Sequence, residues 1–179
     1  MRNDILIVGV LLVCWNAAPT AASGEDLLAG LSPGFELLSA DGSKVTLADY
    51  RGKNVLVAFG FTHCLHICPM IAANMARAIR SSEKEAVGIF VSVDTERDTP
   101  AITNAYAGRF GESMIGLGGS HDQVSAAAIE FNVTFVVTKS QDSYTVQHTP
   151  SIFLVGPGGE MIDSFAMNTP TDNIVSAMR

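Results

Sequence analysis

Residues 54–69 read NVLVAFGFTHCLHICP, and this stretch decides the fold. Its first eight residues, 54–61, form a nearly continuous apolar run, which is typical of a β-strand buried on both faces. Residues 69–80 then predict a helix, because proline suits the first helical position and apolar side chains recur at helical spacing along the segment. Cys64 and Cys68 fall in the turn between that strand and that helix.

The rest of the chain alternates strands and helices in an α/β order. Residues 86–93 form a second apolar run, which a right-handed crossover would place parallel to the first strand. The cysteines would then lie outside the carboxyl end of a central strand, where sites gather in open α/β sheets. Turn and capping patterns predict the other elements: a hairpin of 35–38 with 44–47, helices over 99–110, 120–131 and 169–178, strand-rich segments at 133–137 and 144–147, and a hairpin of 151–155 with 160–165.

Composition narrows the class of protein. The chain has 179 residues, of which 47% are hydrophobic and 16% charged, and its formal net charge is −7. These values indicate one globular domain and exclude intrinsic disorder. The acidic balance and the absence of a basic patch argue against a nucleic-acid partner. Three cysteines are too few for a disulfide-stapled scaffold or for a four-thiolate zinc site.

Residues 1–23 have the order of features of a secretory signal: a basic residue near the start, an apolar run, and then small residues. An uncleaved N-terminal anchor is the alternative. A lipoprotein anchor at Cys14 is disfavoured, because Val13 precedes the cysteine where such signals have a small residue. In each case we expect residues 24–179 to be an exported domain, either periplasmic or anchored to the inner membrane and facing the periplasm. Membrane contact would come only from the N-terminal segment, if it is uncleaved.

Export makes the pair Cys64 and Cys68 the most informative feature of the mature chain. Two nearby thiols outside the cytosol tend to oxidise unless a reductant or a metal holds them. The helix that follows favours a thiolate at Cys68, which the sequence places directly before its first residue. The pair can form a disulfide or bind one soft metal ion. A purely structural disulfide is disfavoured, because so short a loop gives little stabilisation.

Four histidines are candidates for a further ligand. His63 and His66 lie in the cysteine loop, and the His66 side chain is expected to point away from the sulfurs. His121 lies at a helix start, where a solvated surface residue is the simplest interpretation. His148 precedes the strand at 151–155, which should neighbour the first long strand. From the residues alone, His148 is either a structural histidine or a ligand.

Three blocks of sequence together carry a family resemblance. They are GFTHC at 60–64 with CP at 68–69, VDTERDTP at 93–100, and QHT at 147–149 followed by FLVGPGG at 153–159. In this order, from about residue 35 to the C-terminus, they resemble the Sco/SenC family of copper metallochaperones. The resemblance implies a thioredoxin-like fold, with a central mixed sheet flanked by helices and an N-terminal β-hairpin.

The resemblance also implies a metal site and a role. The family's copper ligands carry over to Cys64, Cys68 and His148, with one copper ion per chain. Two thiolates and an imidazole suit Cu(I), and the imidazole allows Cu(II) as well. The implied role is delivery of copper to the copper A centre of a cytochrome oxidase, or to a related copper enzyme. The implied partners are an oxidase subunit, a thioredoxin-like reductant and other copper carriers.

Two features depart from the family pattern. Leu65 and His66 stand where the family commonly has proline and aspartate after the first cysteine. Pro150 stands where many thioredoxin-like oxidoreductases have a cis-proline. The sequence therefore allows either a cis or a trans peptide bond between Thr149 and Pro150.

Asp94 and Asp98 within the second block have two interpretations. They are either a solvated turn and helix cap, or residues near the metal that orient its ligands or form a docking surface.

The sequence is compatible with two other functions. In a thiol–disulfide oxidoreductase, Cys64 would attack the recipient's disulfide and Cys68 would resolve the mixed disulfide, so the two would form a redox-active disulfide. Such an enzyme would reduce the recipient's cysteines before metallation and would not need His148. A redox or copper sensor that signals through a partner has the same sequence features.

Overall fold

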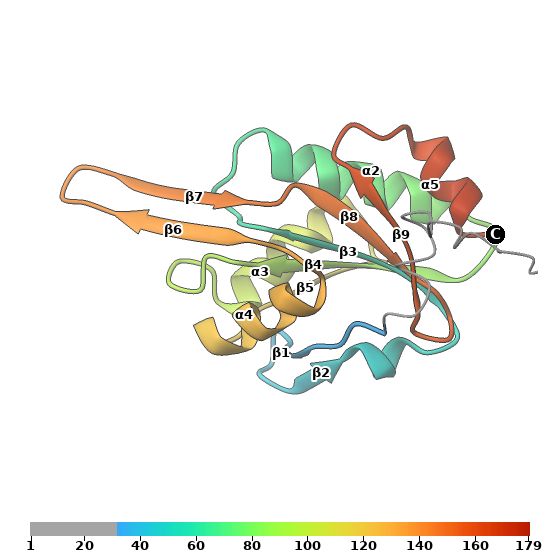
Figure 1. Ribbon diagram of the computed structural model, residues 1–179, viewed down its shortest axis with the longest axis horizontal. Helices are drawn as coiled ribbons and strands as arrows, with labels where there is room; N and C mark the ends of the chain where they lie inside the picture. Colours follow the sequence, from blue (N-terminus) through green and yellow to red (C-terminus); the bar gives the residue numbers. More distant parts are fainter. Residues whose placement is uncertain (1–31) are drawn as a thin grey trace, which may run out of the picture.

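The computed structural model describes residues 32–179 and has a five-stranded mixed sheet at its centre, with the strand order β5-β4-β3-β8-β9 (Figure 1). β3 (Asn54–Gly60), β4 (Ala86–Ser92) and β5 (Met114–Leu117) are parallel. β8 (Ser151–Val155) pairs antiparallel with β3, and β9 (Met161–Ala166) pairs antiparallel with β8. The sequence prediction of two parallel buried strands with 151–155 beside the first is therefore confirmed.

The sheet separates two apolar cores, because alternate side chains of a strand point to opposite faces. Val55, Val57 and Phe59 face the core that is completed by the N-terminal hairpin and α4 (His121–Glu130). Leu56 and Ala58 face the other core. Figure 1 shows helices above and below the sheet, and three of them cover this second core: α2 (Ile67–Ser81), α3 (Pro100–Ala107) and α5 (Thr171–Ala177).

Two hairpins lie outside the central sheet. β1 (Glu36–Leu38) and β2 (Lys44–Thr46) form the N-terminal hairpin, and a 3-10 turn at Leu47–Tyr50 follows it. β6 (Phe135–Lys139) and β7 (Tyr144–His148) form a separate two-stranded sheet that projects from the body of the molecule (Figure 1). A second 3-10 turn, Gly108–Phe110, extends α3 to the predicted end of that helix.

The boundary of α2 corrects one prediction. The helix begins at Ile67, two residues before Pro69, so Cys68 lies inside its first turn. Pro69 is tolerated as the third helical residue, because the N–H groups of the first turn have no partner within the helix.

One strand and one peptide bond also differ from expectation. β5 was not predicted from the sequence, because this four-residue strand contains Gly116 and is too short to show a strand period. Every peptide bond that the structure describes is trans, so the cis alternative at Pro150 is wrong.

The predictions for residues 1–23, including the signal or anchor and Cys14, lie outside the described residues. Among residues 32–179, no helix combines the length and apolar character that crossing a bilayer requires.

Candidate metal centre

The cysteine loop joins the end of β3 to the start of α2. The Cys64 N–H donates a hydrogen bond to the Phe61 carbonyl oxygen at 3.3 Å, and this bond closes a turn within the loop. The backbone N–H of Cys68 donates to the Cys64 sulfur at 3.4 Å. Both cysteines are free thiols; Cys68 is fully buried and Cys64 is half-buried. The loop therefore presents two sulfurs at different depths at the carboxyl end of β3.

Gly60 is required by the close approach of Cys68 to the strand. A Cβ atom on Gly60 would lie 2.6 Å from the Phe90 ring and 3.0 Å from the Cys68 sulfur. Any other residue at this position would displace one of those two side chains. The last residue of β3 thus lets the buried thiol pack directly against the sheet.

The two thiols differ in acidity, in the order opposite to the one expected from sequence. Burial raises the pKa of the Cys64 thiol, but hydrogen bonds from Cys68 and from the backbone N–H groups of His66 and Ile67 outweigh it, so the pKa lies below its ordinary value. Burial raises the pKa of Cys68 to about 12. The first turn of α2 points its N–H groups at the Cys64 sulfur, so Cys64 and not Cys68 gains the stabilised thiolate.

His148, the last residue of β7, reaches the buried thiol. Its Nε2 lies 3.5 Å from the Cys68 sulfur, and its Nδ1 lies 3.1 Å from the Thr149 carbonyl oxygen. A carbonyl only accepts hydrogen bonds, so Nδ1 carries the proton and Nε2 presents its lone pair toward Cys68. Burial lowers the pKa of His148, which keeps the imidazole neutral at neutral pH. The edge-on ring of Phe61, 6.0 Å away between centroids, packs against it.

The structure thus places Cys68 beside both Cys64 and His148, and these are the three residues that the family resemblance implied as ligands. Among residues 32–179, no three side chains of the His, Cys, Asp or Glu type already stand at metal-binding distances from one another. The donor set nevertheless fits a soft ion: one stabilised thiolate, one buried thiol and one neutral imidazole with its lone pair directed at that thiol.

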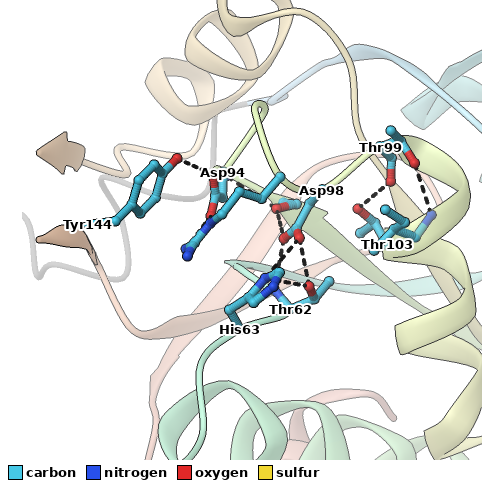
Figure 2. A network of polar contacts seen from close by, with 10 residues as sticks. Thr62, His63, Asp94, Asp98, Thr99, Thr103 and Tyr144 are labelled. Carbon is cyan, nitrogen blue, oxygen red and sulfur yellow. Dashed lines mark hydrogen bonds and ion pairs between the residues drawn. The ribbon is translucent and has the colours of Figure 1, made fainter. Parts of the chain in front are cut away.

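Asp94 and Asp98 are buried, with 0% and 3% of their surface exposed, so the interpretation as solvated residues is wrong. Thr99, and not Asp98, caps α3 by accepting the Ile102 N–H. The Asp98 carboxylate instead accepts the Thr62 N–H at 2.8 Å and the Thr62 hydroxyl at 2.6 Å (Figure 2). It also accepts the Ser92 hydroxyl at 2.6 Å. Asp98 therefore ties the cysteine loop, which begins at Phe61, to the loop after β4.

Asp94 lies at the other end of the same loop and contacts the β6–β7 hairpin. Its carboxylate accepts the Tyr144 hydroxyl and pairs with Arg97 (Figure 2). No motif in the sequence marks Thr62, Arg97 or Tyr144. Tyr144 could have been found, because the alternation of a strand places it on the same face as His148.

The side chains of the other three histidines are exposed. The His63 ring is near Asp98, with 3.5 Å between Nδ1 and Oδ1, and its side chain is exposed. The His66 side chain is exposed as well. His121 is exposed at the start of α4, and its ring meets the ring of Phe135.

Comparison with known proteins agrees with the fold. A model of the SCO1/SenC family matches residues 25–179. The mitochondrial SCO1 homolog 1 of Arabidopsis thaliana is 33% identical over 149 residues, which cover 80% of this chain and 45% of the relative. The chain thus spans about half the length of the curated relatives it matches.

Two solved structures are similar over most of their length. The crystal structure of Arabidopsis thaliana ScoI with copper bound has a TM-score of 0.73 at 32% identity, covering 82% of this chain and 94% of that one. The second is BsSco, a member of the Sco family of cytochrome c oxidase assembly proteins in which a disulfide switch has been identified. It has a TM-score of 0.67 at 28% identity, covering 84% and 92%. The expected thioredoxin-like architecture is confirmed, and the chain belongs to the SCO1/SenC family.

Proposed function

We propose that this protein binds one copper ion per chain through Cys64, Cys68 and His148 and delivers it to a respiratory oxidase. One observation carries the proposal: the 3.5 Å approach of the His148 Nε2 to the Cys68 sulfur. These residues come from segments 80 positions apart, and the fold orients a neutral imidazole lone pair toward a buried thiol. The copper-bound structure of Arabidopsis ScoI supports the choice of metal.

The three ligands contribute differently to binding. Cys64 ionises first because its pKa is lowered, and it supplies the first thiolate. Cys68 keeps its proton in the free protein because its pKa is raised to about 12, so binding releases that proton. His148 is neutral before binding and costs no proton. Two sulfurs and one imidazole nitrogen form a soft set that accepts Cu(I) and also allows Cu(II).

Delivery starts at Cys64 in this proposal. Its sulfur is half-buried, whereas Cys68 is fully enclosed, so a ligand from another protein can approach Cys64 first. The recipient we propose is the copper A centre of a cytochrome oxidase, or a related copper enzyme. The description of BsSco as a cytochrome c oxidase assembly protein supports this recipient.

The location and the other partners follow from the same proposal. We place the domain on the exported side, periplasmic or anchored to the inner membrane by residues 1–23. A thioredoxin-like reductant would keep Cys64 and Cys68 reduced, and other copper carriers would supply the ion. Asp94 and Asp98 act by orienting the ligand-bearing segments, since both carboxylates are buried and bonded to those segments.

Thiol–disulfide exchange is the second candidate function, and the unequal acidities of the cysteines favour it. The Cys64 thiolate would attack a disulfide of the recipient, and one recipient sulfur would leave as a thiolate. Cys68 would then lose its proton and attack the mixed disulfide, which frees the second recipient thiolate. The recipient gains two electrons, this chain ends with a Cys64–Cys68 disulfide, and a thioredoxin-like reductant restores it. The disulfide switch described for BsSco supports such chemistry at this pair.

Copper uptake by the reduced and oxidised forms of the domain tests the proposed function. The reduced protein is expected to bind one copper ion per chain and the oxidised protein far less. Two sulfurs about 2.05 Å apart in a disulfide cannot ligate one ion as separate thiolates. Metal analysis after gel filtration, with thiol titration of the same samples, measures both quantities. Equal uptake by the two forms would contradict the proposed site.

A further inference from the structure

The hairpin that carries His148 has no strand pairing with the central sheet. A lone two-stranded hairpin is marginally stable in water, so its orientation depends on its other contacts. Beyond the last residue pair of the ladder, Thr134 and Thr149 also bond each other, at 3.0 Å and 3.2 Å. These bonds join the two strands to one another, so they stabilise the hairpin itself and not its packing against the body.

One face of β7 points inward along the whole strand. Tyr144, Val146 and His148 are half-buried, while the two residues between them are exposed. The register pairs this face of β7 with Lys139, Val137 and Phe135 of β6. Val146 and Phe135 pack against the core. The inner face therefore has the imidazole at its base, apolar contacts in its middle and Tyr144 at its far end.

The far end is fixed to the loop after β4 by a group of contacts. The Tyr144 hydroxyl donates to the Asp94 carboxylate at 2.5 Å (Figure 2). The Arg97 guanidinium, which pairs with the same carboxylate, lies 3.8 Å from the centroid of the Tyr144 ring. Lys139, the residue opposite Tyr144, pairs with Glu96. Asp94 is fully buried, so its bond to the tyrosine is shielded from solvent.

The loop that receives Tyr144 also holds the cysteine loop. The Asp98 N–H donates to the Asp94 carbonyl at 2.9 Å, and the Asp98 carboxylate accepts both donors of Thr62. Thr62 lies two residues before Cys64. One five-residue segment, 94–98, therefore fixes both the hairpin that bears the imidazole and the loop that bears the first thiolate.

We propose that Tyr144 is a positioning residue, which keeps His148 beside Cys68 by holding the far end of the hairpin against Asp94 and Arg97. It acts from about 13 Å along the strand, four residues at about 3.3 Å each. The consequence for copper binding rests on the function proposed above. The positioning of the hairpin by Tyr144 does not rest on that function, because every contact named is present without metal.

Tyr144→Ala removes the hydroxyl and the ring, whereas Tyr144→Phe removes only the bond to Asp94 and keeps the stacking with Arg97. Thr145→Ala is the matched control, on the exposed outer face of the same strand. In the copper-free, reduced protein, amide exchange over residues 135–148 should rise roughly tenfold in Tyr144→Ala, less in Tyr144→Phe and less than about twofold in the control. The NMR contact between the His148 and Phe61 rings should weaken in the same order.

Copper titration of the same variants tests the positioning of the ligand. Tyr144→Ala should raise the copper dissociation constant roughly tenfold and weaken the imidazole nitrogen coupling in the electron paramagnetic resonance spectrum of the Cu(II) form. The thiolates should stay bound, because neither cysteine is altered. Unchanged amide exchange in Tyr144→Ala would overturn the proposal whatever the copper result. Faster amide exchange in Tyr144→Ala, together with a wild-type copper dissociation constant and nitrogen coupling, would also overturn the proposal. Tyr144 would then stabilise the hairpin without positioning His148.

A wild-type protein that takes up no copper would refute the proposed function alone. The exchange rates and the ring contact would then still decide whether Tyr144 positions His148.

Discussion

Cys64 and Cys68 are only four residues apart, yet their surroundings separate their chemistry. The N–H groups of the first turn of α2 converge on the Cys64 sulfur and stabilise its thiolate. Cys68 is enclosed between Gly60 and the second core, where a charge is costly. The sequence predicted a low pKa for Cys68, because Cys68 stands next to the helix. In the structure the pKa of Cys68 is raised. The effect of burial on the pKa of Cys68 outweighs the effect of the helix N-terminus, and the sequence does not show how deeply a single residue is buried.

Alkylation of the copper-free, reduced protein tests this difference. The thiolate is the reactive form, so Cys64 should react with iodoacetamide at neutral pH, and its rate should rise with pH to a plateau above its pKa, which lies below the ordinary thiol value. Cys68 should stay unreactive over the neutral range, because burial raises the pKa of its thiol and encloses the sulfur. Peptide mass spectrometry after a timed pulse measures both rates, with Cys64→Ser and Cys68→Ser as controls that each remove one thiol of the pair. Faster labelling of Cys68 at pH 7 would show that the acidities are assigned the wrong way round.

At the scale of elements, the loop after β4 determines the geometry of the site. The sequence left two interpretations of its residues Asp94 and Asp98 open: a solvated turn and helix cap, or residues near the metal. The structure buries both carboxylates against segments distant in the chain, Thr62 on one side and Tyr144 on the other. Such pairings depend on which loops meet at the carboxyl edge of the sheet, and local patterns do not encode them. The first and last hairpins and the helix ends depend on local patterns, and the sequence predicted them to within about two residues.

Asp98→Asn tests the role of that loop. The amide cannot accept all of the donors that the carboxylate accepts, so the free energy of unfolding should fall by about 1–3 kcal/mol, and the copper dissociation constant should rise. Asp142→Asn, at an exposed hairpin tip, is the control and should change the stability by less than about 0.5 kcal/mol. Chemical denaturation and copper titration measure the two effects. A destabilised Asp98→Asn protein with wild-type copper affinity would contradict a role in placing the cysteine loop.

At the scale of the whole molecule, the strand order assembles the site. β8 lies antiparallel beside β3, so the chain just before β8 reaches the edge of the sheet where β3 ends. That arrangement places His148 next to Cys68 across 80 residues of sequence. The sequence predicted the neighbouring strands and, through its resemblance to a family, the three ligands. It did not predict Tyr144 and Thr62, because they act through contacts between loops and not through a motif of their own.

Oxidase activity in cells that lack the wild-type protein and grow at limiting copper tests the central claim most directly. Copper delivery predicts that His148→Ala fails to restore activity, that added copper rescues it, and that His121→Ala, which removes an exposed histidine, behaves as wild type. Cys64→Ser should fail as well, because it disables both proposed mechanisms. A His148→Ala protein that supports full oxidase activity without added copper would contradict copper delivery through this site and favour disulfide exchange by Cys64 and Cys68.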